Sequence, residues 1–406
     1  MSTEAESGQQ QGKTFRLELL RSLPQGFIET SGATFSMFIA IRVFDAPDAL
    51  KMAIAAAASV GLLLSLFTVQ FVRRLGCSVN IASAWVWTMS AVGFSIAALS
   101  GSSVHVYLTG VCMAAVFLAL GVPLMSQIYR KHYSDTVRGK LFSLSAMSRS
   151  VIAGMAGLAI GVWLTENGVN FHLLFWCYAG CTLAMAACVL GMSKVKLRKA
   201  QRLRLFDAFE HVGKDAAFRK LLISWMMLGL GNLLCFALFV EYISNPKYGF
   251  ELNAARAGLI TSSIPMMAFI VCVVPWGMVF DKLPFYSVRV LINVFFFAGI
   301  LIFYLGGNYI SLCVGIALHG IGRSGGNVIW SLWVTRFTDA DKVGEYMSVH
   351  TSLTGLRGTI APVIAFSVAG LAGPHIVAIA GGLLIVMSSL MLLPEVKREF
   401  RAKKNT

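Results

Sequence analysis

The stretch HGIGRSGGN, residues 319–327, decides between two incompatible folds. Its glycines Gly320, Gly322 and Gly325 have the spacing G-x-G-x-x-G, which in an α/β protein follows a strand and binds a pyrophosphate at a helix N-terminus. The same residues fit equally well inside a membrane helix, with Arg323 near its centre. The sequence around the stretch has to decide, because the first interpretation requires a strand and a compact βαβ unit.

Composition favours the membrane. Of the 406 residues, 57% are hydrophobic and 13% are charged, whereas a soluble domain carries about 25% charged residues. Uncharged apolar runs of about 18 residues or more recur along the chain, and each is long enough to cross a hydrocarbon core of roughly 30 Å as a helix. We therefore expect an all-α polytopic membrane protein, and no strand before the glycines.

The apolar runs predict about twelve membrane-spanning helices. We place them at residues 23–44, 50–70, 80–100, 104–128, 141–164, 172–192, 221–243, 256–279, 288–306, 309–335, 345–371 and 375–393.

Lysine and arginine orient these spans. An even number of spans puts both termini on one side, and most of the 34 basic residues fall in the segments on that side. The opposite side has Arg42, Lys51, Lys247 and Arg256. Cytoplasmic loops carry the excess of basic residues, so we expect both termini to be cytoplasmic. The basic residues that give the net charge of +15 then border membrane spans, and we expect no nucleic-acid partner.

Three segments lie outside the predicted bundles. Residues 1–22 begin with a polar Ser-, Gln- and Gly-rich stretch and are expected to form a disordered cytoplasmic tail, and residues 394–406 a second cytoplasmic tail. In the linker 194–220, four apolar residues recur at helical spacing among basic ones: Leu203, Phe206, Phe209 and Val212. This pattern predicts an amphipathic helix on an anionic membrane surface. A solvated linker is the alternative.

Catalytic and metal-binding patterns are missing from the sequence. The eight cysteines fall within or beside apolar spans and form no C-x-x-C pair, which argues against disulfides and structural zinc. There is no H-E-x-x-H, no serine-nucleophile elbow and no Walker-type loop. We therefore expect no enzyme activity, no cofactor and no metal, and a transport process would draw on an ion or substrate gradient.

The two halves of the chain are weakly similar. Gly139–Ser143 opens the fifth span and corresponds to Gly344–Ser348, which opens the eleventh, about half the chain away. Duplicated halves are common in transporters. Gly277-Met-Val-Phe-Asp281-Lys282, after the eighth span, resembles the G-x-x-x-D-[RK] loop motif of the major facilitator superfamily, and the resemblance extends over essentially all of the spans.

In that family the loop helps to latch one conformation. The resemblance assigns this role to Gly277, Asp281 and Lys282, in a tight turn where Asp281 can cap helix ends and Lys282 faces anionic lipid. The first-half counterpart departs from the pattern, because Arg73 stands where the acid is expected, followed by Arg74 and Gly76. Any latch is then asymmetric between the halves.

The resemblance also implies two six-helix bundles, at residues 23–193 and 221–393, around a central cavity. The third, sixth, ninth and twelfth spans would face lipid, where a charge costs at least about 2.5 kcal/mol. We therefore expect no charged residue inside these four spans. The charged residues that we place at mid-depth lie instead on the first, fifth, tenth and eleventh: Glu29, Arg149, Arg323 and Arg357. Glu241, near the outer end of the seventh span, is expected to be solvated.

Helical spacing groups the polar residues. Arg323 lies about 21 Å along the helix from Tyr309, which is close to mid-membrane. His319, Arg323 and Asn327 recur at i, i+4 and i+8, and His350, Thr354 and Arg357 form a second stripe on the eleventh span. Trp330 follows the first stripe and could contact an apolar part of a substrate, although packing explains it equally well.

Three arginines against one acid predict an anionic substrate, because arginine stays charged and its planar fork fits a carboxylate or phosphate. The alternative is that arginines pair with Glu29 or with exposed carbonyl groups. A carboxyl group that alternates between apolar surroundings and an arginine can load and release a proton, so Glu29 is the first candidate for proton coupling. His319 and His350 also titrate in the useful range, although hydrogen-bonded structural roles are common for histidines in helix bundles.

The sequence thus predicts a secondary transporter of a small organic anion that works by alternating access, is coupled to protons and functions as a monomer. An exporter of amphipathic compounds is a second hypothesis, with the arginines structural. A lipid-handling or non-transporting sensor or assembly protein with the same fold is a third. Short loops and the absence of a signal peptide favour a bacterial inner membrane.

Overall fold

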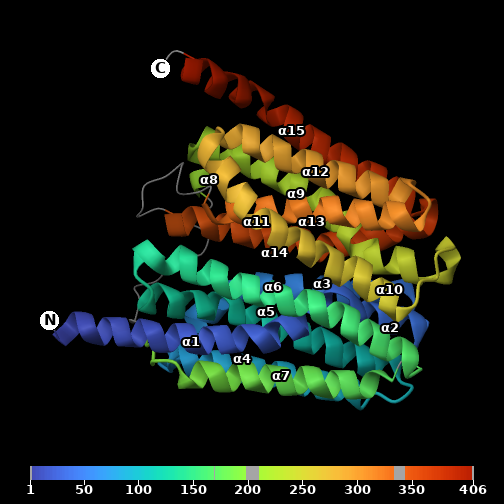
Figure 1. The fold of residues 1–406 in the computed structure, drawn as a ribbon, viewed down its shortest axis with the longest axis horizontal. Coiled ribbons are helices and arrows are strands. Elements are labelled where there is room, and N and C mark those ends of the chain that lie inside the picture. Colours follow the sequence, from blue (N-terminus) through green and yellow to red (C-terminus); the bar gives the residue numbers. More distant parts are fainter. Residues whose placement is uncertain (1, 169, 198–209, 333–342, 405–406) are drawn as a thin grey trace. The chain divides into compact units, whose positions relative to one another are not determined.

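A computed structural model of the protein describes residues 2–168, 170–197, 210–332 and 343–404 (Figure 1). The regular structure of these residues is helical, and the only β-pairing among them is an isolated bridge between Ser78 and Lys196. The chain divides into two compact units. Unit 1 consists of Met1–Leu203 and Ile243–Ser262, and unit 2 of Arg204–Tyr242 and Ser263–Thr406. The all-helical fold class predicted from the sequence is confirmed.

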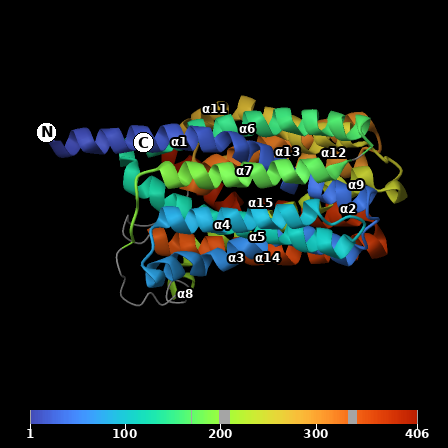
Figure 2. The same cartoon turned by 90° about the horizontal axis from the view of Figure 1, so that it is seen from below.

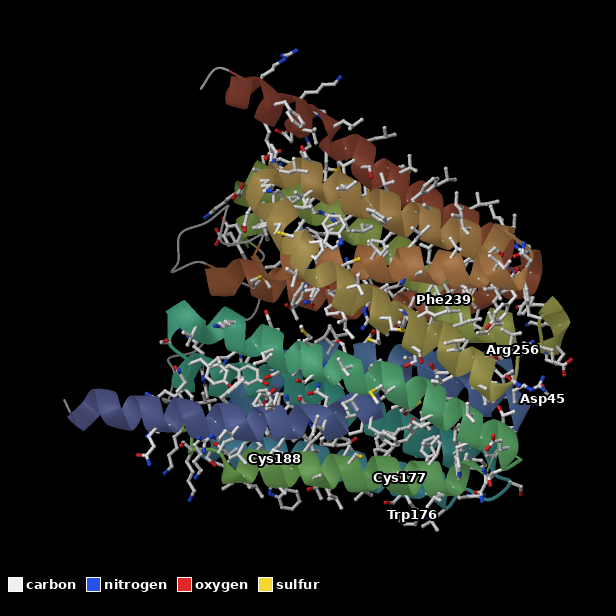
Figure 3. All side chains as sticks on the ribbon, viewed as in Figure 1. Asp45, Trp176, Cys177, Cys188, Phe239 and Arg256 are labelled. Carbon is white, nitrogen blue, oxygen red and sulfur yellow. The ribbon has the colours of Figure 1, made fainter. Side chains whose placement is uncertain are left out.

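Unit 1 is a layered bundle of long helices that run side by side (Figures 1 and 2). Helix α4 packs against α5 and α7, α3 packs against α5, and α1 packs against α6 and α7. Trp176 projects from the outer side of α7 (Figure 3) and is 46% exposed, as expected of a side chain that faces lipid. The elements are α1 (Ser2–Thr30), η1 (Ser31–Phe35), α2 (Ser36–Arg42), α3 (Asp48–Leu75), α4 (Val79–Ala98), α5 (Val104–His132), α6 (Asp135–Glu166), α7 (Phe171–Gly191), η3 (Pro246–Tyr248), α10 (Ala254–Gly258) and η4 (Leu259–Ser263).

Unit 2 is built in the same way. Helix α12 packs against α13 and α15, α11 against α13, and α14 against α15. Close approaches between helices occur where both carry glycine, as at Gly231 of α9 and Gly381 of α15, because a side chain at either position would meet the backbone of the other. The elements are α8 (Glu210–Lys214), α9 (Ala216–Ser244, up to Tyr242 in this unit), α11 (Ile264–Lys282), α12 (Phe285–Leu305), α13 (Tyr309–Leu332), α14 (Val343–Ala372) and α15 (Pro374–Lys404).

Ten helical segments among the described residues are long and apolar enough to cross a membrane, namely α3 to α7, α9, α10 with α11, α12, α14 and α15. The other two predicted spans are also helical. Residues 23–44 fall on α1, η1 and α2, where a π-helical turn interrupts the α-helix, and residues 309–335 fall on α13, described to Leu332. The chain is therefore an integral membrane protein, and its count of about twelve spans stays a prediction.

The expected disordered tail at residues 1–22 is wrong for the residues described, because α1 begins at Ser2. Its polar face packs against the end of α5. Thr14 hydrogen-bonds His132 at 2.9 Å, and the Tyr129 hydroxyl donates to Glu18 at 2.6 Å. Thr14 and Glu18 are buried. The polar composition suggested disorder, but these side chains are satisfied by partners more than a hundred residues away in sequence.

The expected loop motif lies inside a helix. Gly277, Asp281 and Lys282 belong to the last turns of α11, whose C-cap is Leu283. The next helix, α12, begins after Pro284.

The first-half counterpart of the motif does end in a tight turn. Arg73 and Arg74 form the last turn of α3, and Gly76 caps it in the left-handed conformation at φ 67°. Glycine adopts this conformation without the strain that a Cβ atom would cause.

Much of the predicted amphipathic linker helix, including Leu203, Phe206 and Phe209, lies outside the described residues. Val212 lies in the short helix α8.

Candidate functional site

Glu29 and Arg149 form an ion pair between α1 and α6. The two helices approach closely because Gly26 has no side chain, and a Cβ atom there would meet the carbonyl oxygen of Arg149. Arg149 Nε lies 2.8 Å from Glu29 Oε1, and both side chains are 29% exposed. The approach does not meet the angular criteria of a hydrogen bond, since Arg149 Nε has no hydrogen-bond partner among the described residues. Both side chains are partly exposed as a whole, but the Arg149 Nε atom itself is buried.

A π-helical turn, η1, follows Glu29 directly. A second π-helical turn, η4, belongs to the same unit, and the two are joined by a 2.7 Å hydrogen bond between the hydroxyl groups of Thr34 and Thr261. Single π-helical turns within longer helices are frequent at functional sites, because they disturb the regular backbone bonding. The Glu29–Arg149 pair therefore borders a local irregularity of the membrane helix.

A second arginine–glutamate pair in unit 1 is sealed. Arg21 donates from Nε and Nη2 to the two carboxylate oxygens of Glu18, at 2.8 and 2.6 Å. Both side chains are 4% exposed, and the Arg21 guanidinium lies 5.2 Å from the ring centre of Trp87. Burial lowers the pKa of Arg21, but the neighbouring Tyr129 and Glu18 together raise it by more than burial lowers it. The pKa therefore lies above its ordinary value, and Arg21 stays charged. This pair has a structural geometry.

His319 is enclosed in unit 2. Its Nε2 lies 2.7 Å from Asn232 Oδ1, and its ring is surrounded by Phe236, Phe239 (Figure 3) and Phe296 at centroid distances of 6.4, 5.1 and 5.1 Å. This is the hydrogen-bonded structural role that the sequence left open. The expected stripe on α13 accordingly changes character along its length, because His319 is buried while Arg323 and Asn327 are exposed.

Arg357 of α14 contacts the backbone of α9. Its Nη1 donates to the carbonyl oxygen of Trp225 at 2.5 Å and lies 3.9 Å from the Met226 sulfur. The guanidinium occupies space left by Gly229, where a Cβ atom would overlap it. The alternative of pairing with a carbonyl group therefore holds for Arg357, although its Nε has no hydrogen-bond partner among the described residues.

The second predicted stripe is held together by aromatic packing. His350 is fully buried, with its ring 5.4 Å from that of Trp225 and 5.8 Å from that of Trp330. The Thr354 hydroxyl donates to the His350 carbonyl oxygen of the same helix at 2.8 Å. Trp330 thus packs against a histidine.

Sequence reasoning missed Arg289. It is the second residue of the predicted ninth span, a position that the sequence groups with the cytoplasmic cations, and the ninth span is expected to hold no charge. The structure places Arg289 inside unit 2 with none of its surface exposed. Its guanidinium lies 3.8 Å from the ring centre of Trp225. Glu241, expected to be solvated, is also buried. A one-dimensional count of charges cannot tell a buried face of a helix from a solvated end.

The fold is that of known membrane transporters. The chain aligns with a point mutant of the nucleoside transporter NupG at a TM-score of 0.75 and 13% identity, covering 94% of this chain and 99% of that one. A POT family transporter in complex with a thioalcohol-conjugated peptide aligns at 0.74 and 12%, covering 95% and 96%. A D-xylose-proton symporter aligns at 0.69 and 14%, covering 94% and 96%.

Residues 240–406 match the family model described as Major Facilitator Superfamily. No curated protein matches the sequence significantly. The fold over nearly the whole chain and the sequence pattern over residues 240–406 confirm the resemblance to the major facilitator superfamily that the sequence indicated.

Proposed function

We propose that the protein is a secondary transporter that moves a small organic anion together with a proton by alternating access. The observation that carries this proposal is the Glu29–Arg149 pair, 2.8 Å apart with both side chains 29% exposed. A charged pair within a membrane segment is costly and marks ion or substrate pathways. Both side chains are also partly exposed, unlike those of the sealed pair of Glu18 and Arg21.

The proposed coupling is an exchange of partners. Arg149 stays charged throughout, whereas Glu29 can take up a proton. When Glu29 is protonated, the Arg149 guanidinium is released to bind a carboxylate or another oxyanion. When the anion leaves, the ionised Glu29 pairs with Arg149 again. One anion and one proton then move together, and the arginine is never left without a negative partner.

We propose a further group of substrate-binding residues within unit 2. Arg323 and Asn327 have exposed side chains on α13, and we assign them to the anion. Arg357 contributes through its Nε, which has no hydrogen-bond partner among the described residues, and His350, Thr354 and Trp330 shape the wall behind it. His319 holds the helix through Asn232. We further propose that Gly277, Asp281, Lys282, Arg73, Arg74 and Gly76 stabilise one transport conformation, in a monomer of a bacterial inner membrane with cytoplasmic termini.

The similar structures agree with this class of activity, since one of them is a proton symporter and the others include a nucleoside transporter. The competing hypothesis of an exporter of amphipathic compounds makes a different prediction, because apolar walls would bind its cargo and replacement of an arginine would change little.

Uptake into proteoliposomes tests the proposal. Labelled benzoate, lactate, citrate and uridine, and a labelled lipophilic cation, are offered with and without an inward-directed proton gradient. Saturable uptake of an anion, accelerated by the gradient and lost in Arg149→Gln, supports it. Uptake of the cation alone, unchanged in that variant, supports the exporter. No saturable uptake of any of these solutes favours the non-transporting hypothesis.

A further inference from the structure

Arg289 is a fully buried cation with an unused edge. Its Nη1 donates to Asn293 Oδ1 at 3.3 Å, and its face lies on Trp225. The other two guanidinium nitrogens, Nε and Nη2, are buried without a hydrogen-bond partner among the described residues. These two nitrogens carry the parallel N–H groups of one edge, which is the edge that binds a carboxylate in a bidentate manner.

Three described acids of unit 2 bond elsewhere. Glu395 accepts from Lys220 at 2.7 Å and Asp215 from Tyr346 at 3.2 Å, while Glu399 accepts from the backbone of Tyr286 at 3.1 Å. A second cation, Arg357, contacts the same tryptophan through the Trp225 carbonyl group. Leaving two guanidinium groups buried together is unfavourable unless an anion accompanies them.

Unit 1 shows what such an edge binds. There Arg21 of α1 lies over Trp87 of α4, and in unit 2 Arg289 of α12 lies over Trp225 of α9. Both units therefore hold an arginine against a tryptophan on another helix of the bundle. In unit 1 the Nε and Nη2 atoms of Arg21 are occupied by the two oxygens of Glu18. The same two nitrogens of Arg289 have no such partner among the described residues.

We propose that the Nε–Nη2 edge of Arg289 binds the carboxylate of a small organic anion, in the manner in which Glu18 binds Arg21. Both nitrogens are closed off from solvent here, so the ligand enters with a local displacement of the neighbouring side chains. The anion is either cargo or a resident solute that balances the buried charge. This site is separate from Glu29 and Arg149 and does not depend on the coupling proposed for them.

Thermal unfolding of the purified full-length protein tests the site. The probe is benzoate, with benzamide as its neutral counterpart of the same shape and chloride as the ionic-strength control. We expect a saturable rise of the unfolding temperature with benzoate only, because a ligand that binds the folded state stabilises it by mass action. An equal rise with chloride would mean charge screening rather than a carboxylate site, and no rise with benzoate would overturn the proposal outright.

Variants locate the effect. Arg289→Lys keeps the charge but loses the planar guanidinium fork, and is expected to weaken the binding of benzoate at least tenfold. Arg289→Gln should abolish its effect. Because either variant could fold poorly, Asn293→Asp provides an independent test. It places a carboxylate beside Arg289 and should weaken the binding of benzoate by a similar factor. The matched control is Arg21→Gln, which lowers the unfolding temperature without ligand but keeps the benzoate response.

Labelled benzoate uptake separates the two sources of the ligand. If Arg289→Lys loses uptake together with the thermal effect, the carboxylate belongs to the cargo. If it loses the thermal effect alone, the anion is resident, and both outcomes support the site. A benzoate effect that is unchanged in the Arg289 and Asn293 variants would overturn the site while leaving the transport proposal to its own uptake test.

Discussion

Arg149 and Glu29 are held 2.8 Å apart across two helices of unit 1, and each side chain remains 29% exposed. In the same unit, Arg21 and Glu18 are paired at 2.6 Å with 4% exposure. The residue types are the same, but we propose that only the partly exposed pair exchanges partners. This contrast separates residues that we expect to affect transport from residues that we expect to affect stability.

Replacement of Glu29 by Gln should uncouple transport from protons. The amide cannot take up a proton, so anion exchange continues while accumulation in response to a proton gradient is lost. Counterflow and gradient-driven uptake in proteoliposomes measure the two activities separately. Glu251→Gln is the control, because Glu251 pairs with Arg42 at 2.9 Å on an exposed part of unit 1. Normal gradient-driven accumulation in Glu29→Gln would rule Glu29 out as the proton carrier.

Replacement of Arg149 should affect the anion itself. Lys keeps the charge but not the planar fork, so Arg149→Lys is expected to raise the KM for the anion about tenfold. Arg149→Gln should remove saturable uptake. Initial uptake rates over a range of anion concentrations give the KM, and Arg42→Lys is the matched control. An unchanged KM in Arg149→Gln would assign Arg149 a structural role.

Breaking the sealed pair of Glu18 and Arg21 should lower the stability of the protein rather than its transport activity. Glu18→Gln leaves the buried Arg21 without its counter-ion, and breaking one side of such a pair costs about 3–5 kcal/mol. A large drop in unfolding temperature is therefore expected, with transport per folded molecule unchanged at a permissive temperature. Glu29→Gln should lower the unfolding temperature less, because both side chains of its pair are partly exposed. Similar losses in both variants would contradict the distinction between the two pairs.

His319 should not set the pH dependence of transport. It is buried against Asn232 and three phenylalanines. His319→Gln is expected to lose about 1–3 kcal/mol of stability, the cost of an unsatisfied buried polar group such as Asn232, and to keep the wild-type pH profile of uptake. A shifted profile would return His319 to the list of proton carriers.

The helices could be predicted because hydrophobic length is a local property. The span predicted at residues 172–192 is observed as Phe171–Gly191, and that at 80–100 as Val79–Ala98. The errors occur where polar residues are satisfied at long range. Residues 14–22 looked like a tail because their partners on α5 are distant in sequence, and Arg289 looked cytoplasmic because Trp225 lies on another helix.

The candidate site shows the same limit. The spacing rules placed Arg323 and His319 on one helical face, but one is exposed and the other is buried, since burial depends on the neighbouring helices. The Glu29–Arg149 pair was foreseen as an alternative because one acid faced several arginines. No sequence pattern indicated that Asn232 would bind His319 or that Gly229 would accommodate Arg357.

Gly229 supplies the last prediction, because its missing side chain is the space that the Arg357 guanidinium fills. In the wild type, Gly229→Ala should displace Arg357 from the Trp225 carbonyl group and lower the unfolding temperature. In an Arg357→Ala background the clash is gone, and alanine is favoured over glycine within a helix by up to about 1 kcal/mol. The same substitution should then be neutral or stabilising, and a double-mutant cycle of unfolding temperatures measures this change of sign. An equal loss in both backgrounds would mean that Gly229 serves the packing of α9 rather than the placement of Arg357.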